Sequence, residues 1–332
     1  MHFRGWIWLL VLGLTSGACE TKPSKSGPPR ETVAVEDKEA IRVGYQKTGT
    51  LYVVRARGTL EKRLAELHAK VEWIDFPSGP ALYEAMRGGN VDLGYVGETP
   101  PVFALAGGVP FVYVAYEPPS PGAEAILVPK ESTIHSVDGL RGKKVALNRG
   151  SNVHFLLVRA LDEASLDLDD IVLVFLPPAD GRAAFDAGHV DAWIIWDPFF
   201  AAAEMAGARV LRNGEGLVNN RAYYVARRDF VAEQPVLLRA ALAELEATAI
   251  WAKSHPKETA TMYAKSTGLP IPVMIKAEKR HDYGAYPMKG TIMSEQQGIA
   301  DLFHALELIP KAVKMRTALP NEVITWRSES RD

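Results

Sequence analysis

Three short polar turns in this sequence could together bind a small anion, because each lies between an apolar, strand-like run and a predicted helix. A helix start presents unpaired N–H groups and a partial positive charge, so it attracts anions. Glycine lets the backbone come close to a ligand, and hydroxyl and amide side chains add donors. The candidate ligand-binding residues of these turns are Gln46, Lys47, Thr48, Gly49 and Thr50, then Gly97, Glu98 and Thr99, then Gly150, Ser151, Asn152 and His154.

Ordinary helix capping is the alternative for any one of these turns, because Ser, Thr and Asn are the usual residues at helix starts. The anion site is therefore predicted from all three turns pointing at one crevice. His154 fits equally as a donor to the anion or as a satisfied histidine in the first turn of a helix.

Two tryptophans and an aspartate could complete the site. Trp193 and Trp196 are an odd number of residues apart in a predicted strand, so at most one of them faces the crevice. We predict that Trp196, at the end of the strand, covers an apolar part of the ligand and that Trp193 lies in the core. Asp197 is either a cap for the helix that follows or a partner for a cationic group. Residues 280–283 add donors where a helix becomes a loop, at a position relative to the crevice that the local pattern does not set.

A repeated βαβ pattern positions two of these segments. Residues 71–100 and 171–198 share one order: a strand closed by proline, a short helix closed by glycine, a Val-Asp pair and a buried apolar strand. The copies lie about a hundred residues apart, the spacing of two similar compact lobes. Shared α/β design explains a single unit, but both copies end at the carboxyl end of a strand, where ligands bind open α/β sheets. We therefore expect two lobes that enclose a small molecule.

The remaining pattern fits two such lobes. Further strands are expected at 41–45, 110–116, 125–128, 144–147, 208–211 and 222–226, and helices at 51–67, 100–106, 154–164, 199–206, 235–254 and 294–306. Gly58 could break the first of these helices, and Ser294 and Gln297 have the spacing of a capping box. The proline-rich segment 117–122 can continue neither a helix nor a strand, so it is interpreted as the first crossing between lobes. The expected division is 39–119 with 225–332 as lobe 1, and 120–224 as lobe 2.

Composition excludes several classes of function. The 332 residues carry a net charge of −2 and are 47% hydrophobic, which suffices for two domain-sized cores and gives no basic face for nucleic acid. One cysteine excludes an internal disulfide, and the eight histidines show no metal-ligand spacing. The sequence contains no Gly-x-Ser-x-Gly elbow, Walker loop or His-Glu-x-x-His motif. We therefore expect no catalysis, no metal and no cofactor.

The N-terminal residues predict export. Residues 1–19 combine a weakly basic start, an apolar run too short to span a bilayer, and small residues before Cys19, as in a secretory signal. The small residues before Cys19 resemble the lipobox of bacterial lipoproteins, so Cys19 is the candidate lipidation site, with plain signal cleavage as the alternative. Residues 20–38 are rich in Lys, Pro, Ser and Glu and are expected to form a disordered tether.

Several motifs, taken together, resemble the aliphatic-sulfonate-binding proteins of bacterial ABC importers over about residues 41–316. They are Val-Gly-Tyr-Gln-Lys at 43–47, Glu-Pro-Pro at 117–119, Asp-Gly-Leu-Arg-Gly-Lys-Lys-Val-Ala at 138–146, Gly-Ser-Asn-Val-His at 150–154 and Val-Asp-Ala-Trp-Ile-Ile-Trp-Asp-Pro at 190–198. The resemblance implies a type II periplasmic-binding-protein fold of the α/β class, with two pseudo-symmetric lobes and a ligand cleft between two crossover segments. It also implies that Glu117, Trp196 and Asp197 line the cleft. Glu98 departs from the family, which usually has Asp there, and Asn152 replaces part of a more serine-rich turn.

The function implied by this resemblance is capture of an aliphatic sulfonate in the periplasm or cell envelope and its delivery to an ABC permease. Taurine, nitrate or another small anion is an alternative ligand. An enzyme on the same two-lobed fold is a second hypothesis, and it predicts a cytosolic protein with a nucleophile or an acid–base pair in the cleft. A ligand-sensing domain presented to a membrane receptor is a third.

Overall fold

The computed structural model of the chain describes residues 39–322 and 324–326. Lys38–Asp332 forms one compact unit. The predicted signal segment 1–19 with Cys19 and the predicted tether 20–38 lie outside the described residues. In the part of the chain that is described, no helix has the length and apolar character needed to cross a membrane.

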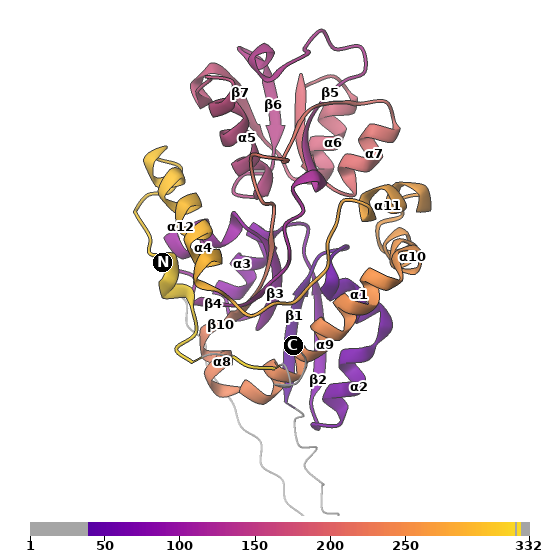
Figure 1. Cartoon of the computed structure of the whole chain (residues 1–332), viewed down its shortest axis with the longest axis vertical. Coiled ribbons are helices and arrows are strands. Elements are labelled where there is room, and N and C mark those ends of the chain that lie inside the picture. The colour runs from indigo at the N-terminus through magenta and orange to yellow at the C-terminus, as the bar shows by residue number, and fades with distance from the viewer. Residues whose placement is uncertain (1–38, 323, 327–332) are drawn as a thin grey trace, which may run out of the picture. The chain divides into compact units, whose positions relative to one another are not determined.

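Two five-stranded sheets organise the chain, each with its own helices, and we call a sheet with its helices a lobe (Figure 1). In both sheets the three strands at one side are parallel, and the fourth strand runs antiparallel to them. In sheet order, the first lobe contains β2 (Lys70–Asp75), β1 (Ala40–Tyr45), β3 (Leu93–Gly97), β10 (Ala222–Arg227) and β4 (Phe111–Tyr116). The second contains β7 (Val172–Phe175), β6 (Lys144–Leu147), β8 (Ala192–Trp196), β5 (Glu124–Val128) and β9 (Arg209–Asn213).

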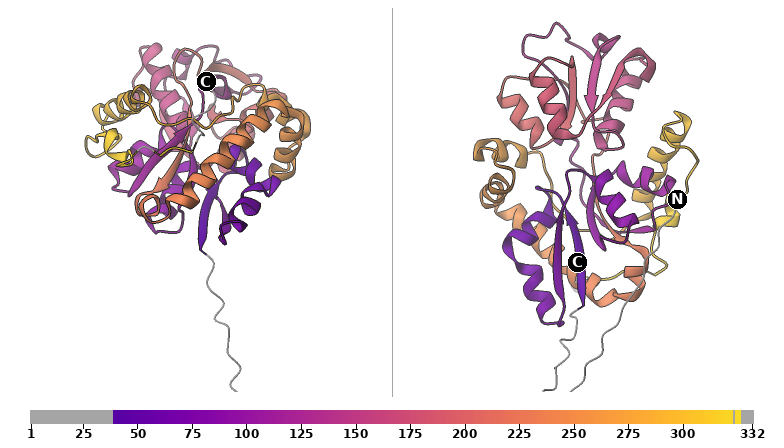
Figure 2. Two further views of the ribbon diagram at one scale, coloured as in Figure 1. Left: turned by 60° about the horizontal axis from the view of Figure 1, so that its bottom comes forward. Right: turned by 180° about the vertical axis from the view of Figure 1, so that it is seen from behind.

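Helices connect these strands and cover the sheets (Figure 2). They are α1 (Thr50–Arg57), α2 (Thr59–Ala65), α3 (Gly79–Arg87), α4 (Pro100–Ala106), α5 (Asn152–Glu163), α6 (Pro178–Asp186), α7 (Phe199–Met205), α8 (Arg228–Glu233), α9 (Pro235–Ser254), α10 (Pro256–Thr267), α11 (Ile271–Glu278) and α12 (Gly290–Ala305). Gly58, with a φ of 62° that glycine adopts without steric cost, separates α1 from α2, as the sequence predicts.

The predicted repeat is present, and a third strand lies inside each copy. β2-α3-β3 and β7-α6-β8 are the two units, with β1 inserted between the strands of the first and β6 between the strands of the second. The aspartate of each Val-Asp pair fastens that inserted strand. Asp92 accepts a hydrogen bond from the backbone N–H of Arg42 at 2.8 Å, and Asp191 accepts one from Lys144 at 2.8 Å. The repeated aspartate thus has the same structural role in both lobes.

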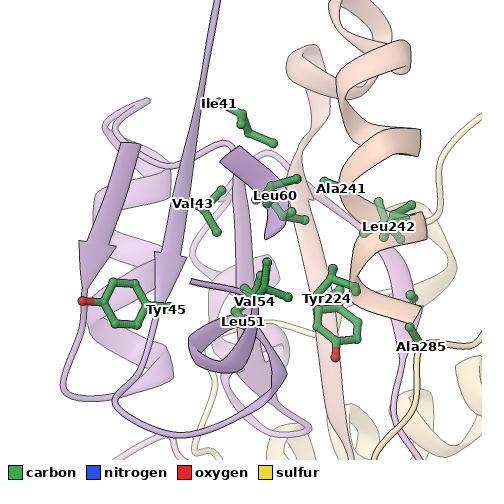
Figure 3. Packing of buried hydrophobic residues seen from close by; sticks show 14 of the residues in the cluster. Ile41, Val43, Tyr45, Leu51, Val54, Leu60, Tyr224, Ala241, Leu242 and Ala285 are labelled. Carbon is green, nitrogen blue, oxygen red and sulfur yellow. The ribbon is translucent and has the colours of Figure 1, made fainter. Parts of the chain in front are cut away.

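Apolar side chains cover both faces of the first sheet. On one face, Ile41 and Val43 pack with Leu51 and Val54 of α1 and with Leu242 of the long helix α9 (Figure 3). A second cluster, centred on side chains of α3, α4, β4 and α12, covers the other face. Because both faces are buried, the central strands read as continuous apolar runs in the sequence.

Two crossings connect the lobes and are hydrogen-bonded to each other. The Ser120 N–H of the first crossing donates to the Asn219 carbonyl of the second at 3.0 Å. The Asn220 side chain donates back to the Ser120 carbonyl at 2.9 Å. The expected lobe boundary at 224/225 falls inside β10, which pairs with the first sheet along its whole length. The return to the first lobe therefore comes before Ala222.

The predicted capping box at Ser294 and Gln297 is wrong. α12 begins at Gly290, so Ser294 lies in its second turn and its hydroxyl donates to the Gly290 carbonyl at 3.1 Å. Gln297 instead accepts a hydrogen bond from the Met315 N–H at 2.8 Å. The same spacing fits the interior of a helix, where Ser commonly bonds the carbonyl four residues earlier.

Candidate functional site

A cavity of about 970 Å³, counting space open to solvent, has residues of both lobes in its wall. The three predicted polar turns all contribute to it. Gln46, Thr48 and Gly49 follow β1, Gly97 ends β3, and Ser151 and Asn152 follow β6. Trp196, Asp197 and Glu117 line the same cavity. The carboxyl ends of parallel strands from the two sheets therefore face one space, as expected for a ligand site in α/β lobes.

Six candidate residues do not line the cavity: Lys47, Thr50, Glu98, Thr99, Gly150 and His154. Lys47 is exposed, and its carbonyl accepts a hydrogen bond from the Ser266 hydroxyl at 2.6 Å. Gly150 adopts a φ of +71° beside the ring of Phe103. The other four, Thr50, Glu98, Thr99 and His154, are buried, and their surroundings are described below.

The first turn requires glycine at position 49. Its φ is +89°, and an added Cβ would lie 2.6 Å from the ring of Tyr95, closer than real side-chain atoms approach. The Gly49 carbonyl accepts hydrogen bonds from the N–H groups of Tyr52 and Val53, which start α1. Gln46 donates to the Tyr95 carbonyl at 3.3 Å. The turn is thereby held against β3, with Thr48 and Gly49 in the cavity wall.

Glu117 is a buried carboxylate that accepts hydrogen bonds from three hydroxyl groups. Thr50 and Tyr224 each donate to its Oε1 at 2.6 Å, and Tyr95 donates to its Oε2 at 2.8 Å. Burial, and next the nearby charge of Glu117, raise the pKa values of both tyrosines well above the usual 10. Thr50 therefore does not line the cavity itself, but its hydrogen bond helps to hold Glu117, which does.

Asn152 bridges the second lobe to the first lobe and to the second crossing. Its Oδ1 accepts a hydrogen bond from the Thr99 N–H at 3.2 Å, and its Nδ2 donates to Oδ1 of Asn220 at 2.6 Å. The amide lies directly over Gly97, where an added Cβ would be 2.1 Å from Oδ1 of Asn152. The Thr99 hydroxyl is buried beside it without a hydrogen-bond partner among the described residues. Thr99 thus contacts Asn152 through its backbone N–H, and the residue lies outside the cavity wall.

The expectation that Glu98 faces the ligand is not supported. Its carboxylate accepts hydrogen bonds from the backbone N–H groups of Asn220 at 3.0 Å and Arg221 at 3.2 Å, so it holds the second crossing. Burial raises the pKa of Glu98 to about 7, although both backbone donors lower it. Glu98 follows the end of β3 directly and does not line the cavity, although Asn220 and Arg221, which it contacts, do.

His154 does not line the cavity, and its ring nitrogen Nε2 is buried without a hydrogen-bond partner among the described residues. Its ring is fully buried among Phe103, Phe175 and Phe303, and its Nδ1 accepts a hydrogen bond from the Gly150 N–H at 3.4 Å. Burial, with a smaller effect of Arg149, lowers the pKa of His154 to about 4. The neutral ring therefore packs α5 of the second lobe against α4 and α12 of the first.

The two tryptophans are placed as predicted. Trp196 lines the cavity, whereas Trp193 is 1% exposed and packs beside Phe185. Asp197 pairs with a cationic group, Arg280, at 3.3 Å, as one of its two expected roles required. It also accepts a hydrogen bond from the Ala201 N–H in the first turn of α7 at 2.9 Å, although Pro198 is the N-cap residue of that helix. Burial raises the pKa of Asp197 to about 6, while Arg280 acts in the opposite direction.

Sequence reasoning missed one wall of the cavity. α10 and α11 supply Tyr263, Met274, Ala277 and Glu278, and the loop after α11 supplies His281. α11 lies against α7 of the second lobe through Ala201, Val273 and Ala277 (Figure 1). The one available signal was the Arg-His-Asp-Tyr segment at 280–283, whose position depends on this helix packing.

The arrangement can hold a small polar molecule against aromatic surface. Hydroxyl, amide and backbone donors come from the turns, and the rings of Tyr95, Trp196 and Tyr263 supply apolar faces. Among the residues described, no group of three or more His, Cys, Asp or Glu could hold a metal ion.

The comparisons identify the family of this chain. The model of the NMT1-like family matches residues 34–267. A protein of Escherichia coli (strain K12) named for binding aliphatic sulfonates is 39% identical, over 94% of this chain and 95% of its own. A Bacillus subtilis (strain 168) protein of the same name is 30% identical, over 86% of each chain.

A solved structure agrees with these sequences. The alkanesulfonate-binding protein of Xanthomonas axonopodis pv. citri, bound to MOPS, superposes with a TM-score of 0.81 at 36% identity. The match covers 84% of this chain and 97% of that one. The chain therefore belongs to the NMT1-like family and has the two-lobed fold of the periplasmic sulfonate-binding proteins.

Proposed function

We propose that this protein captures an aliphatic sulfonate between its lobes and delivers it to the permease of an ABC importer. The observation that carries the proposal is the meeting of three polar turns and Trp196 in one cavity. A sulfonate is ionised at physiological pH, and its three oxygens accept hydrogen bonds from several directions. Uncharged N–H and O–H donors can therefore hold it, and these bonds strengthen as closure of the lobes excludes water.

The residues divide into two groups under this proposal. Donors in direct reach of the ligand come from the cavity wall, and Trp196 covers the apolar chain. Glu117 and Asp197 fix neighbouring groups, since their carboxylates already accept hydrogen bonds. The proposed contact residues are Gln46, Thr48, Gly49, Gly97, Ser151, Asn152 and Trp196. The proposed supporting residues are Lys47, Thr50, Glu98, Thr99, Gly150 and His154.

Relatives support the ligand class. The E. coli and B. subtilis proteins carry names for aliphatic sulfonate binding, and the Xanthomonas protein is an alkanesulfonate-binding protein. A taurine-binding periplasmic protein of E. coli is 29% identical, over 60% of this chain. Taurine therefore stays an alternative ligand, together with nitrate.

Calorimetric titration of the purified protein with straight-chain alkanesulfonates, taurine, sulfate and nitrate tests the ligand class. We expect alkanesulfonates to bind. Asn152→Ala should weaken their binding by about tenfold or more, because it removes the side-chain amide of a residue in the cavity wall. Glu66→Gln, an exposed substitution on the first lobe, is the matched control. Binding of none of these compounds, or tight binding of nitrate alone, would exclude the sulfonate.

We also propose that the protein acts in the periplasm or cell envelope without catalysis, anchored to the membrane through acylated Cys19. The relatives named for sulfonate binding support a binding role. Desulfurization enzymes share the fold at 14–15% identity, a level that supports the fold alone. Cys19 is the only cysteine of the sequence. Cell fractionation with Cys19→Ala as the comparison tests the anchor: the wild type should sediment with membranes and the variant should not, whereas recovery of both in the cytosol would favour an enzyme.

A further inference from the structure

The charged residues in the cavity wall are mostly acidic, which is unexpected around an anion. Glu117, Asp197 and Glu278 line it, against Arg221 and His281. Like charges repel each other, and the repulsion is stronger where water is excluded. A sulfonate with no other charge would meet this repulsion in a closed cavity.

Two of these five groups are neutralised by partners outside the wall. Asp197 pairs with Arg280, whose Nη1 lies 3.3 Å from Oδ2, and also accepts the Ala201 N–H. Arg221 pairs with Glu295, with 2.9 Å between Nε and Oε2. The charges of Asp197 and Arg221 are thereby balanced before any ligand enters.

Glu117 and Glu278 have one imidazole between them. Nε2 of His281 lies 3.5 Å from Oε2 of Glu117, and the charge of His281 also acts favourably on Glu278. The other partner of Glu278 is the hydroxyl of Tyr283, which donates to it at 2.6 Å. Burial raises the pKa of Glu278, although His281 and the Tyr283 hydroxyl act in the opposite direction. Among the described residues of the wall, one imidazole thus faces two carboxylates, so one carboxylate has no counter-charge of its own.

The surroundings of Glu278 suit a cationic group. The ring of Tyr263 and the side chain of Met274 line the cavity on the same wall, together with Ala277. Aromatic faces attract organic cations, and apolar neighbours accept the alkyl groups that such cations carry. We call Glu278, His281, Tyr263, Met274 and Ala277 the Glu278 wall.

We infer that the Glu278 wall binds a positively charged nitrogen of the ligand. The preferred sulfonates are then zwitterions that carry an ammonium group, and plain alkanesulfonates bind less tightly. This inference rests on the proposed function and narrows its ligand class. The sulfonate contacts the donors of the polar turns, and the ammonium group supplies the counter-charge that the two carboxylates lack.

The test compares two ligands of the same shape that differ in charge. In 3-(trimethylammonio)propane-1-sulfonate a nitrogen occupies the place that a carbon has in 4,4-dimethylpentane-1-sulfonate. Titration of the wild-type protein should give at least about tenfold tighter binding of the ammonium compound. Glu278→Gln should remove this preference and strengthen binding of the uncharged-tail compound. Glu258→Gln, the same change at an exposed site on neighbouring α10, is the control and should keep the preference.

The outcomes separate the two proposals. If the uncharged-tail compound binds as tightly as the ammonium compound or more tightly, the inference is wrong and sulfonate binding stands. If neither compound nor any straight-chain alkanesulfonate binds, the proposed function itself fails. If the Glu278→Gln protein does not fold, the two affinities of the wild-type protein, for the ammonium compound and for the uncharged-tail compound, still decide the inference.

Discussion

Replacement of Glu98 by Gln should flatten the pH dependence of stability near neutral pH. Glu98 is fully buried, and its pKa is raised from 4.5 to about 7 in the folded protein. Between these values the folded state keeps a proton that the unfolded state has released, so the free energy of unfolding falls as pH rises. Each pH unit in this window costs up to about 1.4 kcal/mol, which amounts to about 3 kcal/mol in all. Gln cannot ionise, so the variant lacks this cost.

Urea denaturation of wild type and Glu98→Gln from about pH 4.5 to about pH 8 measures the effect. The variant loses one of the acceptors for the Asn220 and Arg221 N–H groups, so it should be less stable than wild type at the acid end. With rising pH the difference should shift in favour of the variant by about 3 kcal/mol. A constant difference across this range would refute the assignment of a neutral, buried Glu98. Because both proteins share every other titrating group, that comparison isolates this carboxyl.

Three further substitutions test other contacts. Gly97→Ala should push the Asn152 amide from its position and cost about 1–2 kcal/mol in thermal or urea unfolding, and the double change with Asn152→Ala should cost less than the sum of the two. Arg280→Met should leave the Asp197 carboxylate buried without its cation and lower the free energy of unfolding by about 3 kcal/mol, whereas an unchanged urea midpoint would contradict a stabilising ion pair. Trp196→Ala should weaken sulfonate binding by about tenfold in calorimetry with a smaller loss of stability than Trp193→Ala, because Trp193 is the fully buried one.

The fold was predictable because its signals are local. Apolar runs closed by proline or glycine defined the strands, and the Val-Asp repeat identified the two halves. The insertion of β1 and β6 inside the repeat units was not predictable, because strand order depends on pairing between distant segments. The polar turns were found for a related reason: each one joins a strand to a helix and ends at the carboxyl edge of its sheet.

The candidate site was predicted less completely than the fold. Glu98 and Thr99 are neighbours of Gly97 in the sequence, yet the side chain of Glu98 turns to the second crossing. The Glu278 wall comes from helices that follow the long helix α9, and their place depends on packing against α7. A pattern of helical periodicity states which face of a helix is apolar, and it does not state which lobe that face will contact.

The position of β10 has a consequence for the order in which the nascent chain can acquire structure. All five strands of the second sheet lie between Glu124 and Asn213, an unbroken stretch. The first sheet is complete only after β10 (Ala222–Arg227) has been added, because this strand pairs with both β3 and β4. During synthesis or translocation the later-encoded half can therefore finish first, while the earlier half keeps an open strand edge of the kind that invites aggregation.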